Sequence, residues 1–135
     1  MVDIANASLA GGVSIGSTCN LVGPGGAFMI GLFAGTLSVV GYVFIQPRLE
    51  SKIKLIDTCG VHNLHGMPGL FGGLCGIVVV PGVVGAQLTG IAMTLITAIV
   101  GGVIAGMAIK ATGTTVEPYE DHPEFTHVPG PDGGH

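Results

Sequence analysis

The chain has 135 residues, of which 48% are hydrophobic and 9% are charged, and its formal net charge is −4. Charged residues make up about a quarter of an ordinary soluble domain, so this composition, with a mean hydropathy of +0.74, excludes a soluble globular protein. Its 25 glycines would weaken soluble helices, but small residues let helices in a membrane approach closely. We therefore expect an all-α, polytopic membrane helix bundle.

The first uncharged stretch runs from residue 4 to residue 47 and is long enough for two membrane crossings. We predict spans over about residues 5–21 and 27–45, separated by a turn at Gly23-Pro24-Gly25-Gly26. The first span is rich in Gly, Ser, Thr and Asn, so it should lie inside a bundle. Pro47 should end the second span. Pairs of glycines at helical spacing, which mark close helix contacts, are Gly12/Gly16, Gly31/Gly35, Gly69/Gly73, Gly72/Gly76 and Gly102/Gly106.

Basic residues set the predicted orientation. Three of the four, Arg48, Lys52 and Lys54, lie in one short loop, and Lys110 follows the last apolar stretch. Short loops rich in Lys and Arg stay in the cytoplasm. Four spans can then be threaded with residues 48–54 inside and residues 23–26 and 81–85 outside. We predict an integral, multi-pass protein of the cell or cytoplasmic membrane with a cytoplasmic C-terminus.

The second uncharged stretch, residues 58–109, opens with a polar run that bears two histidines. It holds two further predicted spans, over about residues 58–80 and 85–109. Asp57 stands where a helix N-cap is expected, because its carboxylate can accept backbone N–H bonds. A buried functional carboxylate is the alternative. Pro68 removes one helical hydrogen bond, so the helix should bend or open just below His65.

Cys59, His62 and His65 recur every three residues at the start of this third span. An ionisable side chain that faces hydrocarbon costs about 2 to 3 kcal/mol even on lenient scales, so one that is kept usually faces the protein interior or a water-filled path. We interpret His65 as facing such a path. The three residues could instead bind a transition metal, although they supply only three ligands. Each histidine could also be merely hydrogen-bonded within the bundle.

The predicted transmembrane region covers residues 1–111, and its character changes after that. Four prolines and five acidic residues lie between residues 112 and 135, which predicts a flexible, acidic cytoplasmic tail. The tail histidines, His122, His127 and His135, should be solvated. The odd number of cysteines argues against a disulfide framework.

Two segments carry a resemblance to a known family. Asp57-Thr58-Cys59-Gly60-Val61-His62-Asn63-Leu64-His65-Gly66-Met67-Pro68-Gly69 resembles the histidine-bearing span of the Rhesus (Rh) branch of the ammonium transporter family. Asn6-Ala7-Ser8-Leu9-Ala10-Gly11-Gly12-Val13 resembles an earlier span of the same proteins, and the similarity covers about residues 4 to 125. Family members have eleven spans and assemble as trimers with one pore per subunit. The resemblance implies that this chain matches their last four spans.

The resemblance implies part of an ammonium/ammonia channel that conducts neutral NH3, or CO2, through a histidine-lined apolar pore. It implies no enzyme, no cofactor and no nucleic-acid partner. His65 matches one of the two histidines that meet in the family's pore. His62 and Asn63 lie beside it as further candidates for the pore, and Asp57 and Pro68 as structural residues near it.

The other pore histidine, the outer aspartate and the aromatic gate of the family lie in earlier spans, which have no counterpart here. The chain is therefore expected to be a fragment that does not conduct alone. Its implied partners are ammonia or ammonium, the lipid bilayer, the missing N-terminal spans or a complementary chain, and two further copies in a homotrimer.

Two other classes of function stay open on the residues alone. A noncatalytic assembly or regulatory membrane subunit would need only the glycine faces and the tail, and His65→Ala would leave its function untouched. A transition-metal transporter would need Cys59, His62 and His65 together. Tight Zn²⁺ binding that disappears in Cys59→Ser would favour it.

Overall fold

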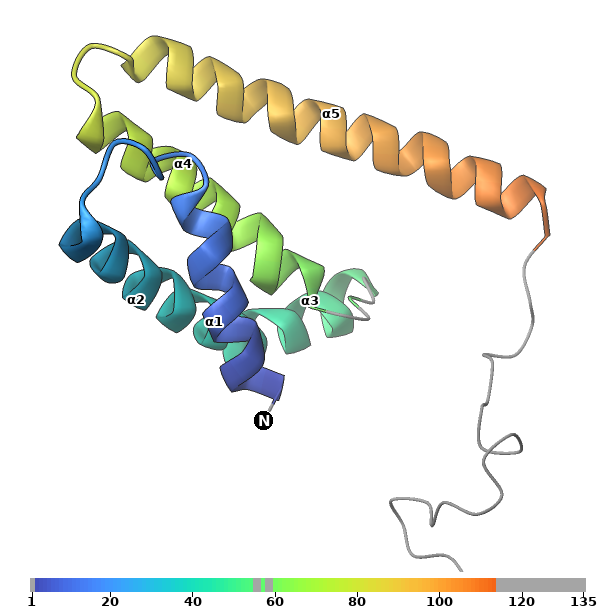
Figure 1. Cartoon of the computed structure of the whole chain (residues 1–135). Helices are drawn as coiled ribbons and strands as arrows, with labels where there is room; N and C mark the ends of the chain where they lie inside the picture. Colours follow the sequence, from blue (N-terminus) through green and yellow to red (C-terminus); the bar gives the residue numbers. More distant parts are fainter. Residues whose placement is uncertain (1, 55–56, 58–59, 114–135) are drawn as a thin grey trace, which may run out of the picture. The chain divides into compact units, whose positions relative to one another are not determined.

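The computed structural model describes residues 2–54, 57 and 60–113, and all regular structure in these residues is helical. This confirms the all-α class. The chain forms two compact units, the first reaching Ile96 and the second beginning at Thr97. In chain order (Figure 1) the elements are α1 (Val2–Ile15), α2 (Pro24–Val40), the π-helical turn η1 (Gly41–Ile45), α3 (Gln46–Ile53), the π-helical turn η2 (His62–Gly66), α4 (Met67–Val79) and α5 (Val84–Ala111).

The first helix is shorter than predicted. α1 ends at Ile15, whereas we expected the span to reach about residue 21. The chain turns instead, with the amides of Thr18 and Leu21 donating to the carbonyls three residues earlier at 2.9 Å. Gly, Ser, Thr and Asn dominate this segment, and these residues favour turns over helix interiors. The predicted turn was therefore placed too late in the sequence.

The second helix begins earlier than predicted. Pro24 is its first residue, so Gly23-Pro24-Gly25-Gly26 is not a turn but a helix start, with Gly23 as the N-cap in extended conformation. Proline suits this position because its fixed φ matches the helix and its missing N–H would be unpaired there anyway.

The prediction that Pro47 ends the second span is wrong. α2, η1 and α3 form one continuous helix from Pro24 to Ile53. A proline ring normally clashes with a carbonyl in the preceding turn. Here that turn is the wider η1, closed by the Gln46 amide on the Gly41 carbonyl. The extra residue of a π-turn displaces the preceding carbonyls from the ring, so the helix continues past the proline.

The last two helices overlap the predicted spans over about residues 58–80 and 85–109. η2 and α4 run from His62 to Val79, and α5 from Val84 to Ala111, with Gly82 at a φ of +82° in the connection. Within the described part of the chain, two helices are long and apolar enough to cross a membrane, Pro24–Ile53 and Val84–Ala111, and Ile4–Ile15 is a shorter apolar helix. The predicted tail lies outside the described residues from residue 114 onward.

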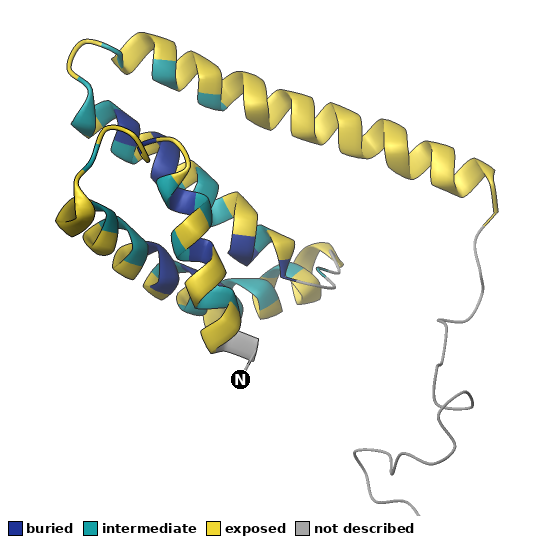
Figure 2. Ribbon diagram, in the orientation of Figure 1, coloured by how far each residue is buried: buried dark blue, intermediate teal, exposed yellow. Residues whose placement is uncertain are grey.

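The interior of the first unit is made of small residues at which helices α1, α2 and α4 meet. A Cβ atom added to Gly35 would lie 3.1 Å from the Ala7 carbonyl oxygen, and one added to Gly11 would lie 3.4 Å from the Gly31 Cα. The predicted contact through Gly31 and Gly35 is thus confirmed. Figure 2 shows the buried positions on these three helices, and they include Ala10, Ser14, Ala34 and Ser38.

α5 differs from the other helices in exposure. Its Gln87 side chain donates to the Gly73 carbonyl at 2.9 Å, and a Cβ on Gly73 would lie 3.2 Å from Ile91. From Ala92 onward every described residue is exposed (Figure 2). Gly102 and Gly106, a predicted contact pair, have nothing within 4 Å of an added Cβ, and neither does Gly12.

Candidate functional site

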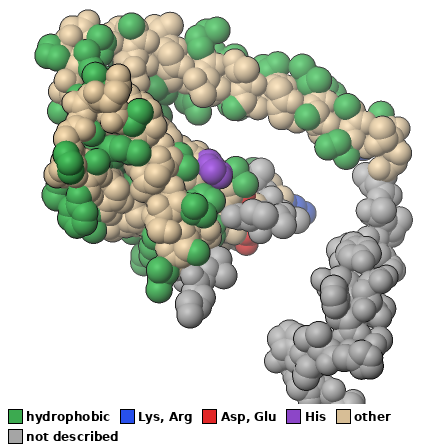
Figure 3. Space-filling view, viewed as in Figure 1, with side chains coloured by type: hydrophobic (Ala, Val, Ile, Leu, Met, Phe, Trp, Pro, Cys, Tyr) green, Lys and Arg blue, Asp and Glu red, His purple; other side chains and the backbone are tan. Residues whose placement is uncertain are grey.

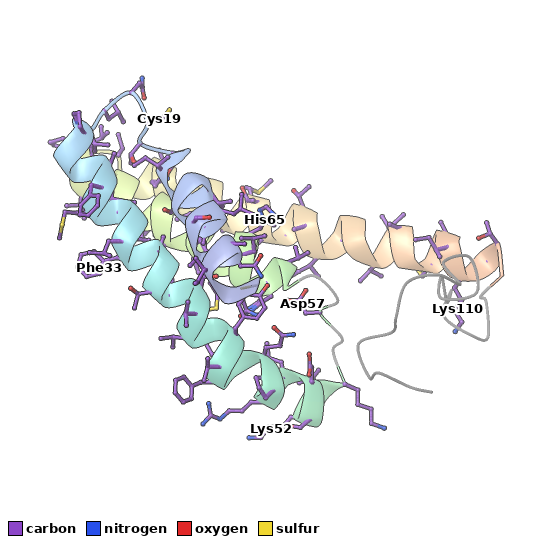
Figure 4. All side chains as sticks on the ribbon, turned by 60° about the horizontal axis from the view of Figure 1, so that its bottom comes forward. Cys19, Phe33, Lys52, Asp57, His65 and Lys110 are labelled. Carbon is purple, nitrogen blue, oxygen red and sulfur yellow. The ribbon has the colours of Figure 1, made fainter. Side chains whose placement is uncertain are left out.

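Asp57 caps the helix that carries the histidines. Its two carboxylate oxygens accept from the backbone amides of Val61 at 2.8 Å and His62 at 2.9 Å. These amides belong to the first helical turn, where no backbone carbonyl is available to them. The predicted capping by the carboxylate is therefore observed, although Asp57 lies before the N-cap residue itself. Figure 4 labels Asp57 at this helix start.

Gly60 completes the start of the helix and only glycine fits there. Its φ is +65°, and an added Cβ would overlap the hydroxyl of Tyr42. The same hydroxyl accepts from the Asn6 amide nitrogen at 2.7 Å. Tyr42 of η1 thus contacts α1 and Gly60, which lies two residues before the histidine turn.

The histidines lie on the wide turn η2, which directly precedes Pro68. The Met67 amide donates to the His62 carbonyl, five residues back, instead of the usual four. The predicted opening of the helix near His65 is therefore confirmed, and it takes the form of a π-turn. Such turns are frequent at functional sites.

The wide turn points its polar side chains in different directions. His65 is exposed, His62 is half-buried, and Asn63 is completely buried at 0% exposure. Figure 4 labels His65 on this stretch. In the face shown in Figure 3, histidine atoms reach the surface beside hydrophobic side chains. Of the three candidate pore residues, the structure thus leaves His65 exposed and His62 partly exposed, and it places Asn63 inside the helix packing.

Asn63 belongs to a polar network that links the two wide turns. Its amide nitrogen donates to Gln46 Oε1 at 2.8 Å, and Gln46 Nε2 donates to Glu50 Oε1 at 2.9 Å and more weakly to the Asp57 carbonyl at 3.4 Å. His62 Nδ1 lies 3.3 Å from Asn63 Oδ1. A Cβ on Gly41 would lie 2.4 Å from Asn63 Oδ1, so a larger residue there would displace the Asn63 side chain.

Gln46 and Gly41 are site residues that sequence reasoning missed. One signal was available: η1 and η2 each begin six residues before a proline, Pro47 in one case and Pro68 in the other. A proline inside a predicted apolar span therefore marked a wide turn at both places.

The structure does not describe all three residues of the alternative metal site, Cys59, His62 and His65. Cys59 lies outside the described residues, as do His122, His127 and His135. Among residues 2–54, 57 and 60–113, no three His, Cys, Asp or Glu side chains come together as metal ligands would. An open groove between α1 and α2 also contains neither histidine, and its lining residues are Ala7, Gly31, Leu32, Gly35, Thr36 and Val39.

Comparison with known proteins adds to this geometry. Residues 1–127 match the sequence model of the Ammonium Transporter Family. The chain belongs to this family. Ammonium transporter Rh type A of Bos taurus is 41% identical over 90% of the chain and 30% of its own length, and Rh type C of Rattus norvegicus is 37% identical over 82% of the chain and 28% of its own length.

The chain is also similar to a solved structure of an Rh protein. Rh50 of Nitrosomonas europaea, described with the mechanism of conduction by the Rhesus protein family of channels, superposes with a TM-score of 0.86 and is 67% identical. The superposition covers 97% of this chain and 35% of Rh50. These relatives place the chain in the Rh branch. The chain spans about a third of the length of the relatives that it matches, or less.

Proposed function

We propose that this chain is the last four-span portion of a channel that conducts neutral ammonia, and that His65 lines the conduction path. The observation that carries the proposal is the exposed His65 on the wide turn η2, within an apolar stretch that has no Asp, Glu, Lys or Arg from residue 58 to residue 109. A polar side chain is costly in such surroundings unless it meets water, another polar group or a cargo.

The chemistry of the imidazole suits ammonia. A neutral imidazole carries one N–H donor and one acceptor nitrogen, and ammonia both donates and accepts. An ammonium ion would carry the large cost of moving a charge out of water, whereas ammonia requires only hydrogen-bonding partners. Loss of a proton at the mouth of the path therefore removes the barrier. K⁺ has no proton to lose and is rejected. Carbon dioxide is a second neutral cargo of the same path.

The remaining parts of the proposal concern assembly and orientation. The helices α1, Pro24–Ile53, His62–Val79 and α5 supply the four spans, and the other pore-lining groups come from N-terminal spans or a complementary chain. The complete protein is a homotrimer. Residues 48–54 and the acidic segment from 112 onward are cytoplasmic, because the basic residues cluster at Arg48, Lys52, Lys54 and Lys110.

The test is ammonia and methylammonium flux into vesicles that contain the complete channel, with K⁺ as competitor. His65→Leu should lower flux by about 5- to 150-fold, which corresponds to the about 1 to 3 kcal/mol that an unmet buried hydrogen bond costs. His65→Glu should instead admit cations, because a carboxylate stabilises a charge where the imidazole met a neutral molecule.

The matched control is His122→Leu, the same substitution in the acidic tail, which should leave flux unchanged. Protein level and trimer content are measured for each variant. If both His65 variants keep the flux and the selectivity of the parent channel, His65 has no part in conduction.

A further inference from the structure

The role of His62 is open in the proposed function, and the network around Asn63 bears on it. The network connects four side chains in series. Polar atoms of Glu50 and Gln46 lie 2.9 Å apart, those of Gln46 and Asn63 lie 2.8 Å apart, and those of Asn63 and His62 lie 3.3 Å apart. Each amide in it has one oxygen that only accepts and one nitrogen that only donates. The orientation of one amide therefore dictates the orientation of the next.

Gln46 is oriented by two acceptors. Its Nε2 faces the Glu50 carboxylate at 2.9 Å and the Asp57 backbone carbonyl at 3.4 Å, and neither group has a proton to give when the carboxylate is ionised. A reversed Gln46 amide would bring an oxygen against both of them. The Asp57 carbonyl favours the same orientation if Glu50 is protonated. Gln46 Oε1 must therefore face Asn63.

Asn63 transmits this orientation to His62. Because Gln46 presents an oxygen, Asn63 must present Nδ2, which donates at 2.8 Å. Its Oδ1 then faces His62 Nδ1 at 3.3 Å. Asn63 is completely buried, so a reversed amide would leave buried polar atoms facing groups of the same kind. The oxygen that faces His62 can only accept, so His62 Nδ1 must carry the proton.

We infer that Gln46 and Asn63 are positioning residues that keep a proton on His62 Nδ1, so that the neutral ring is held as the Nδ1-protonated tautomer. Its other ring nitrogen, Nε2, is then a fixed hydrogen-bond acceptor on the same wide turn as His65. The chemical class that fits an acceptor nitrogen is a small N–H or O–H donor, such as ammonia or water. The tautomer itself does not depend on transport, so it can be tested even if the proposed function fails.

The experiment is solid-state NMR of the complete protein, labelled with ¹³C and ¹⁵N in histidine and reconstituted in lipid. The two neutral tautomers of an imidazole give different ring carbon and nitrogen shifts, and the His62 signals are assigned by their loss in His62→Phe. The inference expects His62 with a protonated Nδ1 and an unprotonated Nε2. A proton on Nε2, or a mixture of tautomers, in the unaltered protein would overturn it without any variant of the network.

Two substitutions at position 46 test the relay. Gln46→Met removes the oxygen that orients Asn63, so the Asn63 amide can reverse and the Nε2-protonated tautomer of His62 should appear. Gln46→Glu, when its carboxylate is ionised, keeps an accepting oxygen toward Asn63 and should preserve the original tautomer. If Gln46 mattered only for packing, the two variants would not differ in the tautomer of His62 in this way.

The matched control is Gln87→Met, the same change at a glutamine that donates to the Gly73 carbonyl and does not touch the network. It should leave the His62 shifts unchanged. If Gln46→Met also leaves them unchanged, the relay through Gln46 is refuted. Asn63→Leu provides a second variant, since it removes the acceptor next to His62 and should give the same change of tautomer.

Discussion

Gly72 is the position at which the closest approach between helices can be tested. A Cβ atom added to Gly72 would lie 2.0 Å from the Ser14 carbonyl oxygen, whereas ordinary van der Waals contact begins at 3.4 Å. Gly72→Ala therefore requires α1 and α4 to separate locally by the difference of those distances, about 1.4 Å. The obstacle is backbone and not a flexible side chain, so the cost should lie at the upper end of the about 1 to 3 kcal/mol typical of overpacked cores.

The assay is unfolding of the reconstituted protein by SDS, followed by circular dichroism, with Gly72→Ala compared with the parent chain. A loss of about 3 kcal/mol corresponds to a change of about 150-fold in the folded-to-unfolded ratio. Gly12→Ala is the control, because nothing lies within 4 Å of its added Cβ. It should change the free energy of unfolding by no more than about 1 kcal/mol. Equal stability of the two variants would refute the close contact of α1 with α4.

Three further outcomes follow from the fold and the proposed orientation. Asp57→Ala removes both carboxylate acceptors from the amides of Val61 and His62 and should lower the free energy of unfolding by about 0.5 to 2 kcal/mol. Asp57→Asn keeps one acceptor oxygen and should lower the free energy of unfolding by less. Equal losses of stability in the two variants would argue against the cap. In a cysteine-free background, a cysteine at position 51 should react with impermeant reagents only from the cytoplasm and one at position 25 only from outside, and the opposite pattern would overturn the orientation. Expressed alone in a membrane, the chain should aggregate or be degraded, because interhelical hydrogen bonds worth about 0.6 to 2 kcal/mol each would be missing. A stable, monodisperse four-span monomer in size-exclusion chromatography would contradict this prediction.

Local signals explain what the sequence predicted correctly. Asp57 caps its helix, and the helix opens next to Pro68, because both effects depend on atoms within a few residues. The connection at Gly82 follows from the same local chemistry of glycine and proline. The all-α class followed from composition, since an apolar chain of this kind must satisfy its backbone hydrogen bonds within helices.

Signals that depend on distant contacts were misread. Pro47 was predicted to end its helix, but, like Pro68, it lies in a helix that continues past it, because a wide turn precedes each proline. The Gln46–Asn63 bond joins residues that are 17 positions apart, so no local pattern indicates it. Gly31 and Gly35 pack against α1, but their spacing, which Gly102 and Gly106 share, does not by itself identify the neighbouring helix.

The charge that crosses with the cargo tests the account most directly. Vesicles that hold the complete channel are exposed to an ammonium gradient while internal pH and membrane current are recorded together. If ammonia crosses as a neutral molecule past His65, the interior becomes alkaline without a current, and His65→Leu slows the alkalinisation. A current that grows in proportion to the flux, and that His65→Leu leaves unchanged, would contradict the account.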